Sequence, residues 1–579
     1  MTTKTHFDII EHNADLCVVG GGIAGLCAAV AAARNGSQVI LIQDRAVLGG
    51  NASSEVRMWI CGARGPDNKE AGILEEIMLD NYYRNPTLNY LIWDTVLYEK
   101  ARFQPGLTML LSCTCNDVRM DGDRIASIRA WQLNTQTWHI VKARYFADCS
   151  GDSVLRISGA EYRWGRESRH EFDESHAPAV ADRKTMGNSI LIQLREIAEG
   201  EHRPFTPPAW AIRYDESNLP NRPLKPEGHN FWWLEVGGTG DTIADTEANR
   251  DELLKIAYGI WAYIKNHPDG RGQRWELEWI GALPGKRENV RYVGDHILTQ
   301  NDVLAGGKFD DIVAYGGWPM DDHHPDAIHY PGEPTIFHKA PSPYGIPYRS
   351  LYSRNIGNLF FAGRNISATH MALSSTRVMG TTALLGQAAG TAAAVAARHD
   401  ASPHGVYERH LAELQARLMD DDSWLPGLRR PIPEICQEAQ LFASVGDPEP
   451  LRNGIDRTLG KEDNGWWAPP GESVTYYFGS PMKLSSVRLV FDSDLHNLKR
   501  MPCSYPLAGH DVKIPKMMTR AFDLEILDSA GQWQIAFREE NNYQRLVKAP
   551  LAVETAGLRL IPRASWGAER VHLFGFDAR

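Results

Sequence analysis

The stretch Asp15-Leu-Cys-Val-Val-Gly20-Gly-Gly-Ile-Ala-Gly25 decides the fold. Its apolar start predicts a buried strand, which ends in the glycine pattern Gly20-x-Gly22-x-x-Gly25. Gly20 permits a tight turn, Gly22 lets the backbone approach a pyrophosphate, and Gly25 allows the following helix to pack closely on the sheet. The N-terminus of that helix then faces the phosphates, where its N–H groups and dipole stabilise negative charge. The stretch therefore predicts a dinucleotide-binding site.

The residues that follow complete a βαβ unit. An alanine-rich helix is predicted up to Arg34, Asn35-Gly36 ends it, and the next strand covers Gln38–Gln43. The unit takes about 30 residues, which implies parallel strands and a right-handed crossover. An acid for the adenosine ribose is expected at position 43, where this chain has glutamine. We expect Gln43 or Asp44 to contact the ribose.

Bulk properties exclude several classes of protein. The net charge of −11 over 579 residues argues against nucleic acid as a partner. The N-terminus lacks the features of a secretory signal, and no apolar run reaches the ~20 residues that span a bilayer, so we expect a cytoplasmic protein without a membrane span. The cysteines form neither a disulfide framework nor a metal-binding pattern, and we predict no metal site.

The pattern of elements along the chain predicts an α/β protein with a discontinuous cofactor domain. A Rossmann-like dinucleotide-binding domain is interrupted by an α+β substrate domain, and short strands near the C-terminus indicate a β-sandwich. A single long helix is predicted over Thr376–Arg398. The expected boundaries are 14–160 and 346–400 for the two parts of this cofactor domain, which the resemblance described next identifies as FAD-binding, 161–345 for the substrate domain, 401–445 for a helical connector and 446–579 for the sandwich.

Three separated segments resemble the FAD-dependent oxidoreductases of the glutathione-reductase-like superfamily, in the branch with fumarate reductase. These segments are Gly20–Gly25 with Leu48-Gly-Gly-Asn-Ala-Ser-Ser54, then Ala147-Asp-Cys-Ser-Gly-Asp152, then Phe361-Ala-Gly-Arg-Asn365. The chain is also similar to a bacterial group of these enzymes associated with sugar metabolism, through Ile346-Pro-Tyr-Arg349 and Ala362–His370. The resemblance covers roughly residues 14 to 400 and implies FAD as the cofactor.

The resemblance also implies which residues hold FAD. Gly49, Gly50 and Asn51 are expected at the pyrophosphate and the approach to the flavin, and Asp148 and Gly151 near the adenine half. Arg364 stands where the family usually has the acid that serves the ribityl chain, so that contact is expected to pass to Asn365 or to the backbone. The full set of expected cofactor-binding residues is Gly20, Gly22, Ile23, Ala24, Gly25, Gln43, Asp44, Arg45, Gly49, Gly50, Asn51, Ser54, Asp148, Gly151, Gly363, Arg364, Asn365 and Gly380.

Histidine suits the base of a substrate oxidation, because its ordinary pKa lies near working pH. His370 follows the third FAD segment, and His323 and His324 end the run Trp318-Pro-Met-Asp-Asp-His-His324. Arg291 could orient a hydroxylated or carboxylated substrate, as could Lys286, Arg287, Arg349 and Arg377. With 20 histidines in the chain, the alternative for each is an ordinary surface or core residue.

These observations predict an oxidoreductase that transfers hydride from a polyhydroxylated small molecule, such as a sugar or glycoside, to flavin N5. Two alternatives stay open: a redox-neutral flavoenzyme that isomerises or eliminates, and a non-catalytic flavin- or glycan-binding protein. The sandwich could bind glycan or serve a structural role. The electron acceptor is unknown, and a homo-oligomer is left open.

Overall fold

The computed structural model describes residues 7–219, 221–497 and 499–579. These residues fall into two compact units, which we describe separately. Of the described residues, unit 1 comprises those within 7–63, 87–414 and 500–511, and unit 2 comprises those within 64–86, 415–499 and 512–579.

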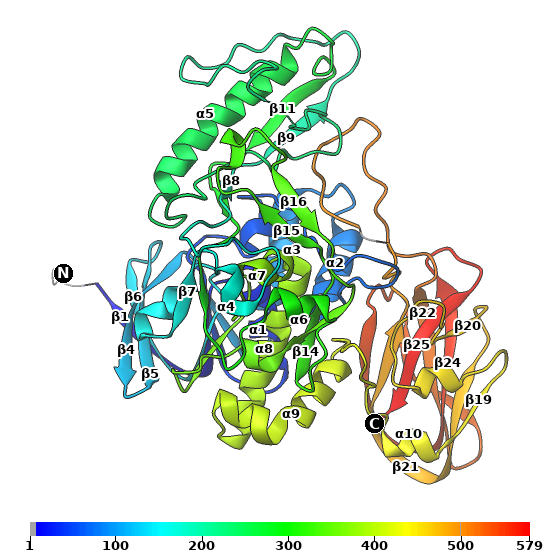
Figure 1. Cartoon of the computed structure of the whole chain (residues 1–579). Coiled ribbons are helices and arrows are strands. Elements are labelled where there is room, and N and C mark those ends of the chain that lie inside the picture. Colours follow the sequence, from blue (N-terminus) through cyan, green and yellow to red (C-terminus); the bar gives the residue numbers. More distant parts are fainter. Residues whose placement is uncertain (1–6, 220, 498) are drawn as a thin grey trace, which may run out of the picture. The chain divides into compact units, whose positions relative to one another are not determined.

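Unit 1 is built on a seven-stranded sheet in the order β3-β2-β1-β6-β5-β4, with β18 added on β6 (Figure 1). Strands β1, β2 and β3 run parallel, as do β1, β6 and β18, whereas β4 and β5 extend the sheet as antiparallel hairpins. This confirms the mixed α/β class and a Rossmann-like parallel core. The strands are β1 (Ile9–Val19), β2 (Val39–Ile42), β3 (Leu107–Leu110), β4 (Cys113–Asp121), β5 (Arg124–Gln132), β6 (Thr137–Asp148) and β18 (Leu359–Phe361).

Two buried helices, α1 (Ile23–Arg34) and α8 (Met379–His399), pack against each other with unusually close backbones. A Cβ on Gly386 would lie 2.0 Å from the backbone oxygen of Ala24, and one on Gly390 would lie 2.1 Å from that of Ala28. Such distances exclude any side chain at the two glycines. The small residues of both helices therefore set how closely α8 approaches the cofactor-binding turn.

Replacing Gly386 by alanine is expected to lower the stability of unit 1 by about 1–3 kcal/mol, because the new methyl group forces α1 and α8 apart. This loss exceeds the gain of up to about 1 kcal/mol that alanine brings to a helix interior. Thermal unfolding of the FAD-free protein measures it. Gly479→Ala is the control, because a Cβ there meets no atom within 4 Å; equal melting temperatures for the two variants would contradict the expectation.

The predicted helix over Thr376–Arg398 is wrong at its start. Helix α7 (His370–Thr376) ends there, Arg377 and Val378 leave the helical path, and α8 begins at Met379 after a bend of 95°. Among the described residues no single helix is long and apolar enough to cross a membrane; α7 and α8 pass that test only as a bent pair.

The segment inserted between β6 and β18 forms several small antiparallel sheets and the long helix α5 (Thr246–Lys265), which lies beside β9 and β11 (Figure 1). The apolar side of α5 packs on β9 and β11 through Leu253, Ile256 and Trp261, which meet Leu194 and Trp275 in one buried cluster. The other elements of unit 1 are α3 (Tyr90–Arg102), β7 (Tyr162–Trp164), α4 (Arg169–Phe172), β8 (Asn188–Ser189), β9 (Ile192–Glu196), β10 (Glu235–Val236), β11 (Trp275–Ile280), β12 (Gly285–Lys286), β13 (Val290–Tyr292), α6 (Gln300–Leu304), β14 (Ile312–Gly316), β15 (Met320–His323), β16 (Thr335–His338) and β17 (Tyr344–Pro347).

Unit 2 is an antiparallel β-structure in the order β20-β25-β21-β24-β22-β23, with β19 paired to β21. The chain passes into it within α9 (Pro403–Asp420). Its other elements are α2 (Ile73–Arg84), α10 (Glu434–Glu438), β19 (Gln440–Ala443), β20 (Trp466–Ala468), β21 (Val474–Phe491), β22 (Thr519–Leu527), β23 (Trp533–Glu539), β24 (Leu546–Ser565) and β25 (Val571–Ala578).

Candidate functional site

A cavity of about 270 Å³ lies in unit 1 at the carboxyl ends of the parallel strands. Val19 and Ile42 line it where β1 and β2 end, and Cys149 and Gly363 line it just after β6 and β18. Ligands of open α/β sheets bind outside the carboxyl ends of the strands, so the cavity occupies the expected place.

The glycine-rich turn is shaped to leave room for a ligand. A Cβ on Gly20 would lie 2.5 Å from the Ser150 backbone, and one on Gly25 would lie 1.8 Å from the backbone oxygen of Gly20. Gly22 differs, because a Cβ there would meet no protein atom within 4 Å, although the residue lines the cavity. The space above Gly22 is thus a cradle that a side chain would fill, and it fits a pyrophosphate group.

The start of α1 supplies donors to the same place. No side chain caps this end of the helix, and Ile23 and Ala24 line the cavity beside Gly22. Backbone N–H groups of a first helical turn have no partner within the helix, and they bind phosphate oxygens well.

The side chain of Gln43 makes hydrogen bonds within the protein. Its side-chain oxygen accepts a hydrogen bond from the Gly21 N–H at 2.7 Å, and its amide nitrogen donates to the Val47 carbonyl at 3.1 Å. The amide therefore holds the phosphate-binding turn against β2. Asp44 and Arg45 also line the cavity; the contact of Asp44 with a ribose stays a prediction.

Asp152 joins two cations at the cavity wall. Its carboxylate pairs with Arg364 at 2.5 Å and with Lys286 at 2.7 Å, and all three residues line the cavity. Burial opposes the charged form, but Arg364 and Lys286 together lower the pKa of Asp152 below its ordinary value. The Nε of Arg364 is buried without a hydrogen-bond partner among the described residues.

The structure brings most of the expected cofactor-binding residues together. Those that line the cavity are Gly20, Gly22, Ile23, Ala24, Gln43, Asp44, Arg45, Gly49, Gly50, Asn51, Gly151, Gly363 and Arg364. Gly25, Ser54, Asp148, Asn365 and Gly380 lie behind this lining.

The residues behind the lining hold it in place. Asp148 accepts hydrogen bonds from the Ser150 N–H at 3.0 Å and from the Tyr292 hydroxyl at 2.6 Å. The N–H of Gly380 donates to the Cys61 carbonyl at 2.7 Å, which ties the start of α8 to the cavity wall.

The far end of the cavity is lined by residues that the sequence did not single out as a set. Trp318, Cys61 and Val378 form a small apolar cluster against which Met58 and Trp59 pack. Asp321, Arg287 and Arg377 line the cavity beside this cluster. Two indole rings next to charged groups form a wall that suits a flat, hydroxylated ligand.

Asp321 was missed although it lies within the run of acids and histidines. It accepts a hydrogen bond from the Thr335 hydroxyl at 2.6 Å and pairs with Arg377 at 3.0 Å. Burial opposes ionisation, but His323 and Arg377 hold the pKa of Asp321 well below its ordinary value. The group is therefore a carboxylate at neutral pH.

His370 lies outside the cavity lining, in a buried ion network. Its Nδ1 is 2.8 Å from Glu288 and its Nε2 is 3.2 Å from Asp322. Burial would lower the pKa of His370, but Glu288 and then Asp322 outweigh it and raise that pKa to about 10. The ring is thus a buried cation, and a catalytic role for it stays a prediction.

The other catalytic candidates also lie outside the lining. His323 places Nδ1 2.6 Å from Glu235 and Nε2 3.4 Å from Asp321, directly behind the cavity wall. His324 stacks on Tyr330 with ring centroids 3.6 Å apart. Arg291 is fully buried and pairs with Glu167 at 3.1 Å.

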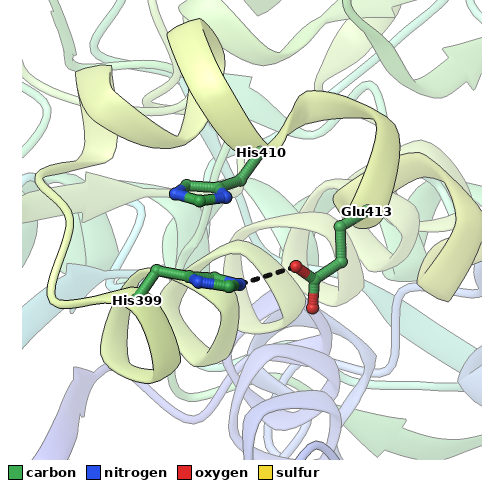
Figure 2. Close-up of side chains that lie close together, drawn as sticks. All are labelled: His399, His410 and Glu413. Atoms are coloured by element: carbon green, nitrogen blue, oxygen red, sulfur yellow. Dashed lines mark hydrogen bonds and ion pairs between the residues drawn. The ribbon is translucent and has the colours of Figure 1, made fainter.

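A separate cluster of metal-ligand types lies between the end of α8 and α9 (Figure 2). The nearest ligand atoms of His399, His410 and Glu413 all lie within 4.8 Å of one another. The two imidazole rings stack nearly parallel at 3.9 Å, and Glu413 also pairs with Arg398 at 2.7 Å. Parallel rings do not direct their nitrogen lone pairs at one point, and the arginine occupies the carboxylate, so the arrangement suits a surface ion pair better than a metal site.

Comparisons with known proteins extend this picture. Residues 15–418 match the family model described as FAD dependent oxidoreductase. No curated protein matches the chain.

Two solved structures illustrate the similarities in structure. A geranylgeranyl bacteriochlorophyll reductase-like protein from Thermoplasma acidophilum is 14% identical, over 71% of this chain and 86% of that one, with a TM-score of 0.32. The family 32 carbohydrate-binding module of Streptococcus pneumoniae EndoD is 16% identical, over 25% of this chain and 97% of that one, with a TM-score of 0.20. At these TM-scores neither similarity supports a conclusion.

Proposed function

Because the chain belongs to the FAD-dependent oxidoreductase family, we propose that it oxidises a polyhydroxylated small molecule, a sugar or glycoside, at the far end of the cavity. The observation that carries the proposal is the wall of Trp59, Trp318 and Asp321. Indole rings stack on sugar rings, and a carboxylate accepts hydrogen bonds from hydroxyl groups.

The protein's own residues define two regions along the cavity. The turn around Gly22 and the start of α1 would hold the pyrophosphate of FAD, and Asp44, which lines the same cavity, would serve the ribose. When bound, FAD supplies an acceptor for two electrons and a hydride at N5. The Asp321 carboxylate would accept the hydrogen bond of the substrate hydroxyl, orient the adjacent C–H bond and take up the hydroxyl proton as the alcohol becomes a carbonyl. His323 and Arg377 hold that carboxylate ionised and in position.

The sheet order supports two finer inferences. The parallel order β3-β2-β1-β6, with β18 beyond, favours the glutathione-reductase-like superfamily. In unit 2, the pairing of the long strands β21 and β24 is interrupted near Tyr477–Met482 and Leu484–Ser486, where strands of a β-sandwich could pass from one layer to the other.

Anaerobic addition of sugars and organic acids to the FAD-loaded enzyme tests the proposed function. Loss of the oxidised-flavin absorbance with a sugar or glycoside is the expected result. Bleaching by amino acids or dicarboxylic acids alone would contradict it. Turnover without any external acceptor would identify a redox-neutral enzyme, and a flavin that no compound reduces would favour a binding protein.

Asp321→Asn is expected to slow flavin reduction by the active sugar about 10- to 100-fold, because a neutral amide loses a charge-assisted hydrogen bond. FAD binding should persist, since the glycine-rich turn is untouched. Stopped-flow absorbance measures the rate. Asp326→Asn is the matched control, because Asp326 is an exposed acid close in sequence that does not line the cavity; an equal effect of both changes would remove Asp321 from the site.

A further inference from the structure

A row of interacting arginine, acidic and histidine side chains runs behind the far wall of the cavity. Arg287 lies 3.3 Å from Glu235, which lies 2.6 Å from Nδ1 of His323. Nε2 of the same ring lies 3.4 Å from Asp321, which pairs with Arg377 at 3.0 Å. The two residues at the ends of this row, Arg287 and Arg377, line the cavity, whereas Glu235 and His323 do not.

Each arginine is fixed from the side that faces the protein. One terminal nitrogen of Arg377 donates to the carbonyl and to the carboxylate of Asp321, at 3.1 and 3.0 Å. Arg287 donates to the Ser189 hydroxyl and to the Trp232 carbonyl, both at 2.8 Å. The two guanidinium groups are therefore preorganised, which reduces the entropy lost when a ligand binds.

Arg287 and Arg377 nevertheless have hydrogen-bond donors that the protein does not use. Among the described residues, Nη1 of Arg377 and Nε of Arg287 make no hydrogen bond, and neither atom is fully enclosed by the protein. Both side chains line the cavity. Burial lowers the pKa of Arg287, Glu235 opposes this, and the like charge of Arg377 lowers it further. An anion between the two side chains would accept hydrogen bonds from these free donors and offset their like charge.

We propose that Arg287 and Arg377 form a clamp for a carboxylate of the substrate, so that the substrate is an acidic sugar or a related hydroxylated acid. This inference rests on the proposed function and narrows its substrate class. Planar guanidinium groups match a carboxylate in shape. Of the charged groups in this row, Arg287, Arg377 and Asp321 line the cavity, whereas Glu235 lies behind it.

The clamp also explains what the buried acids do. Glu235 and Asp321 lie near the two ring nitrogens of His323, and each of these acids pairs with one of the arginines. His323 is thus a positioning residue that keeps the two halves of the clamp together. Bound between the arginines, the carboxylate would leave the hydroxylated part of the substrate beside Asp321, Trp59 and Trp318.

Matched pairs of substrates test the clamp in the FAD-loaded enzyme. Glucuronate is compared with glucose, and galacturonate with galactose, by the concentration dependence of anaerobic flavin reduction. The acid of each pair is expected to react with at least about 10-fold greater efficiency. Arg377→Met should lower the efficiency for the acid about 10- to 100-fold more than the efficiency for the neutral sugar, mainly through weaker binding of the acid. Arg377→Lys should restore part of it, since lysine keeps the charge but not the fork.

Arg354→Met is the matched control, because Arg354 is exposed, pairs with the exposed Glu161 and does not line the cavity. Preference for the neutral sugars would overturn the clamp while supporting the proposed function. If Arg377→Met lowered the efficiency of flavin reduction equally for the acid and for the matching neutral sugar, the clamp would also be overturned, and Arg377 would be placed against the cofactor. A preference for phosphorylated sugars over both the neutral sugars and the sugar acids would overturn the assignment of a carboxylate as the bound group.

A second readout does not need turnover. Glucuronate and acetate are titrated into the oxidised enzyme, and the flavin absorbance spectrum is followed. We expect a saturable spectral change, and we expect Arg377→Met to weaken the apparent affinity for the carboxylate at least about 10-fold. If this change is seen but no compound reduces the flavin, the clamp stands and the proposed oxidation fails. No spectral change with any carboxylate, together with no preference for acids, overturns the clamp.

Discussion

Gly22→Val is expected to abolish FAD binding without harming the fold. The new side chain meets no protein atom near its Cβ, because nothing lies within 4 Å, and it extends into the space above the turn. The pyrophosphate loses both that space and its approach to the start of α1, so we expect the affinity for FAD to fall at least about 100-fold. Flavin content after purification and fluorescence titration with FAD measure the loss.

Gly25→Val provides the contrast. Its Cβ would lie 1.8 Å from the backbone oxygen of Gly20, so this variant should lose the turn and the stability of the FAD-free protein together. Gly22→Val should keep the melting temperature of the FAD-free wild type. If Gly22→Val retained normal FAD affinity, the cavity above the turn would not be the pyrophosphate site.

His370→Gln is expected to lower the free energy of unfolding by about 3–5 kcal/mol near neutral pH, because it leaves Glu288 and Asp322 buried without their shared cation. The effect depends on pH in a defined direction. The pKa of His370 is raised from 6.5 to about 10 on folding, so its stabilisation is complete below pH 6.5 and is lost as pH rises through about 10.

Urea unfolding at several pH values between 6.5 and 10 measures this difference between wild type and variant, which should shrink as pH rises. His324→Gln is the control, since His324 is half-buried, stacks on Tyr330 and joins no buried pair of acids. A difference that stays constant across this pH range would show that His370 is not a buried cation.

The cofactor end of the site could be predicted from sequence because its signals are local. The strand before Gly20, the spacing of the glycines and the alanine-rich helix lie within one short stretch, and the family model agrees with the cofactor they indicate. Asp148 and Asn365 were placed near FAD by resemblance, and the structure shows them behind the lining. Sequence alone does not distinguish a residue that touches a ligand from one that holds its neighbour.

The substrate end could not be predicted because long-range pairing decides it. Residues alternate sides along β15, so Asp321 and His323 face one way and Asp322 faces His370. The position of β15 against β16 and α7 determines which side reaches the cavity. Arg377 reaches the wall only because of the bend between α7 and α8, and the smooth helical pattern over Thr376–Arg398 gave no sign of that bend.

The discontinuous sheet also sets when the protein can acquire its cofactor during synthesis. The cavity lining runs from Val19 to Thr382, and β18 completes the sheet by pairing Phe361 with Asp148. Contacts so far apart in the chain close late and slowly. During synthesis, the glycine-rich turn is therefore made long before the chain can bind FAD. Until β18 has emerged from the ribosome, the incomplete sheet has an unpaired edge at β6. Because FAD binds only the completed form, a supply of flavin during expression should raise the yield of folded protein.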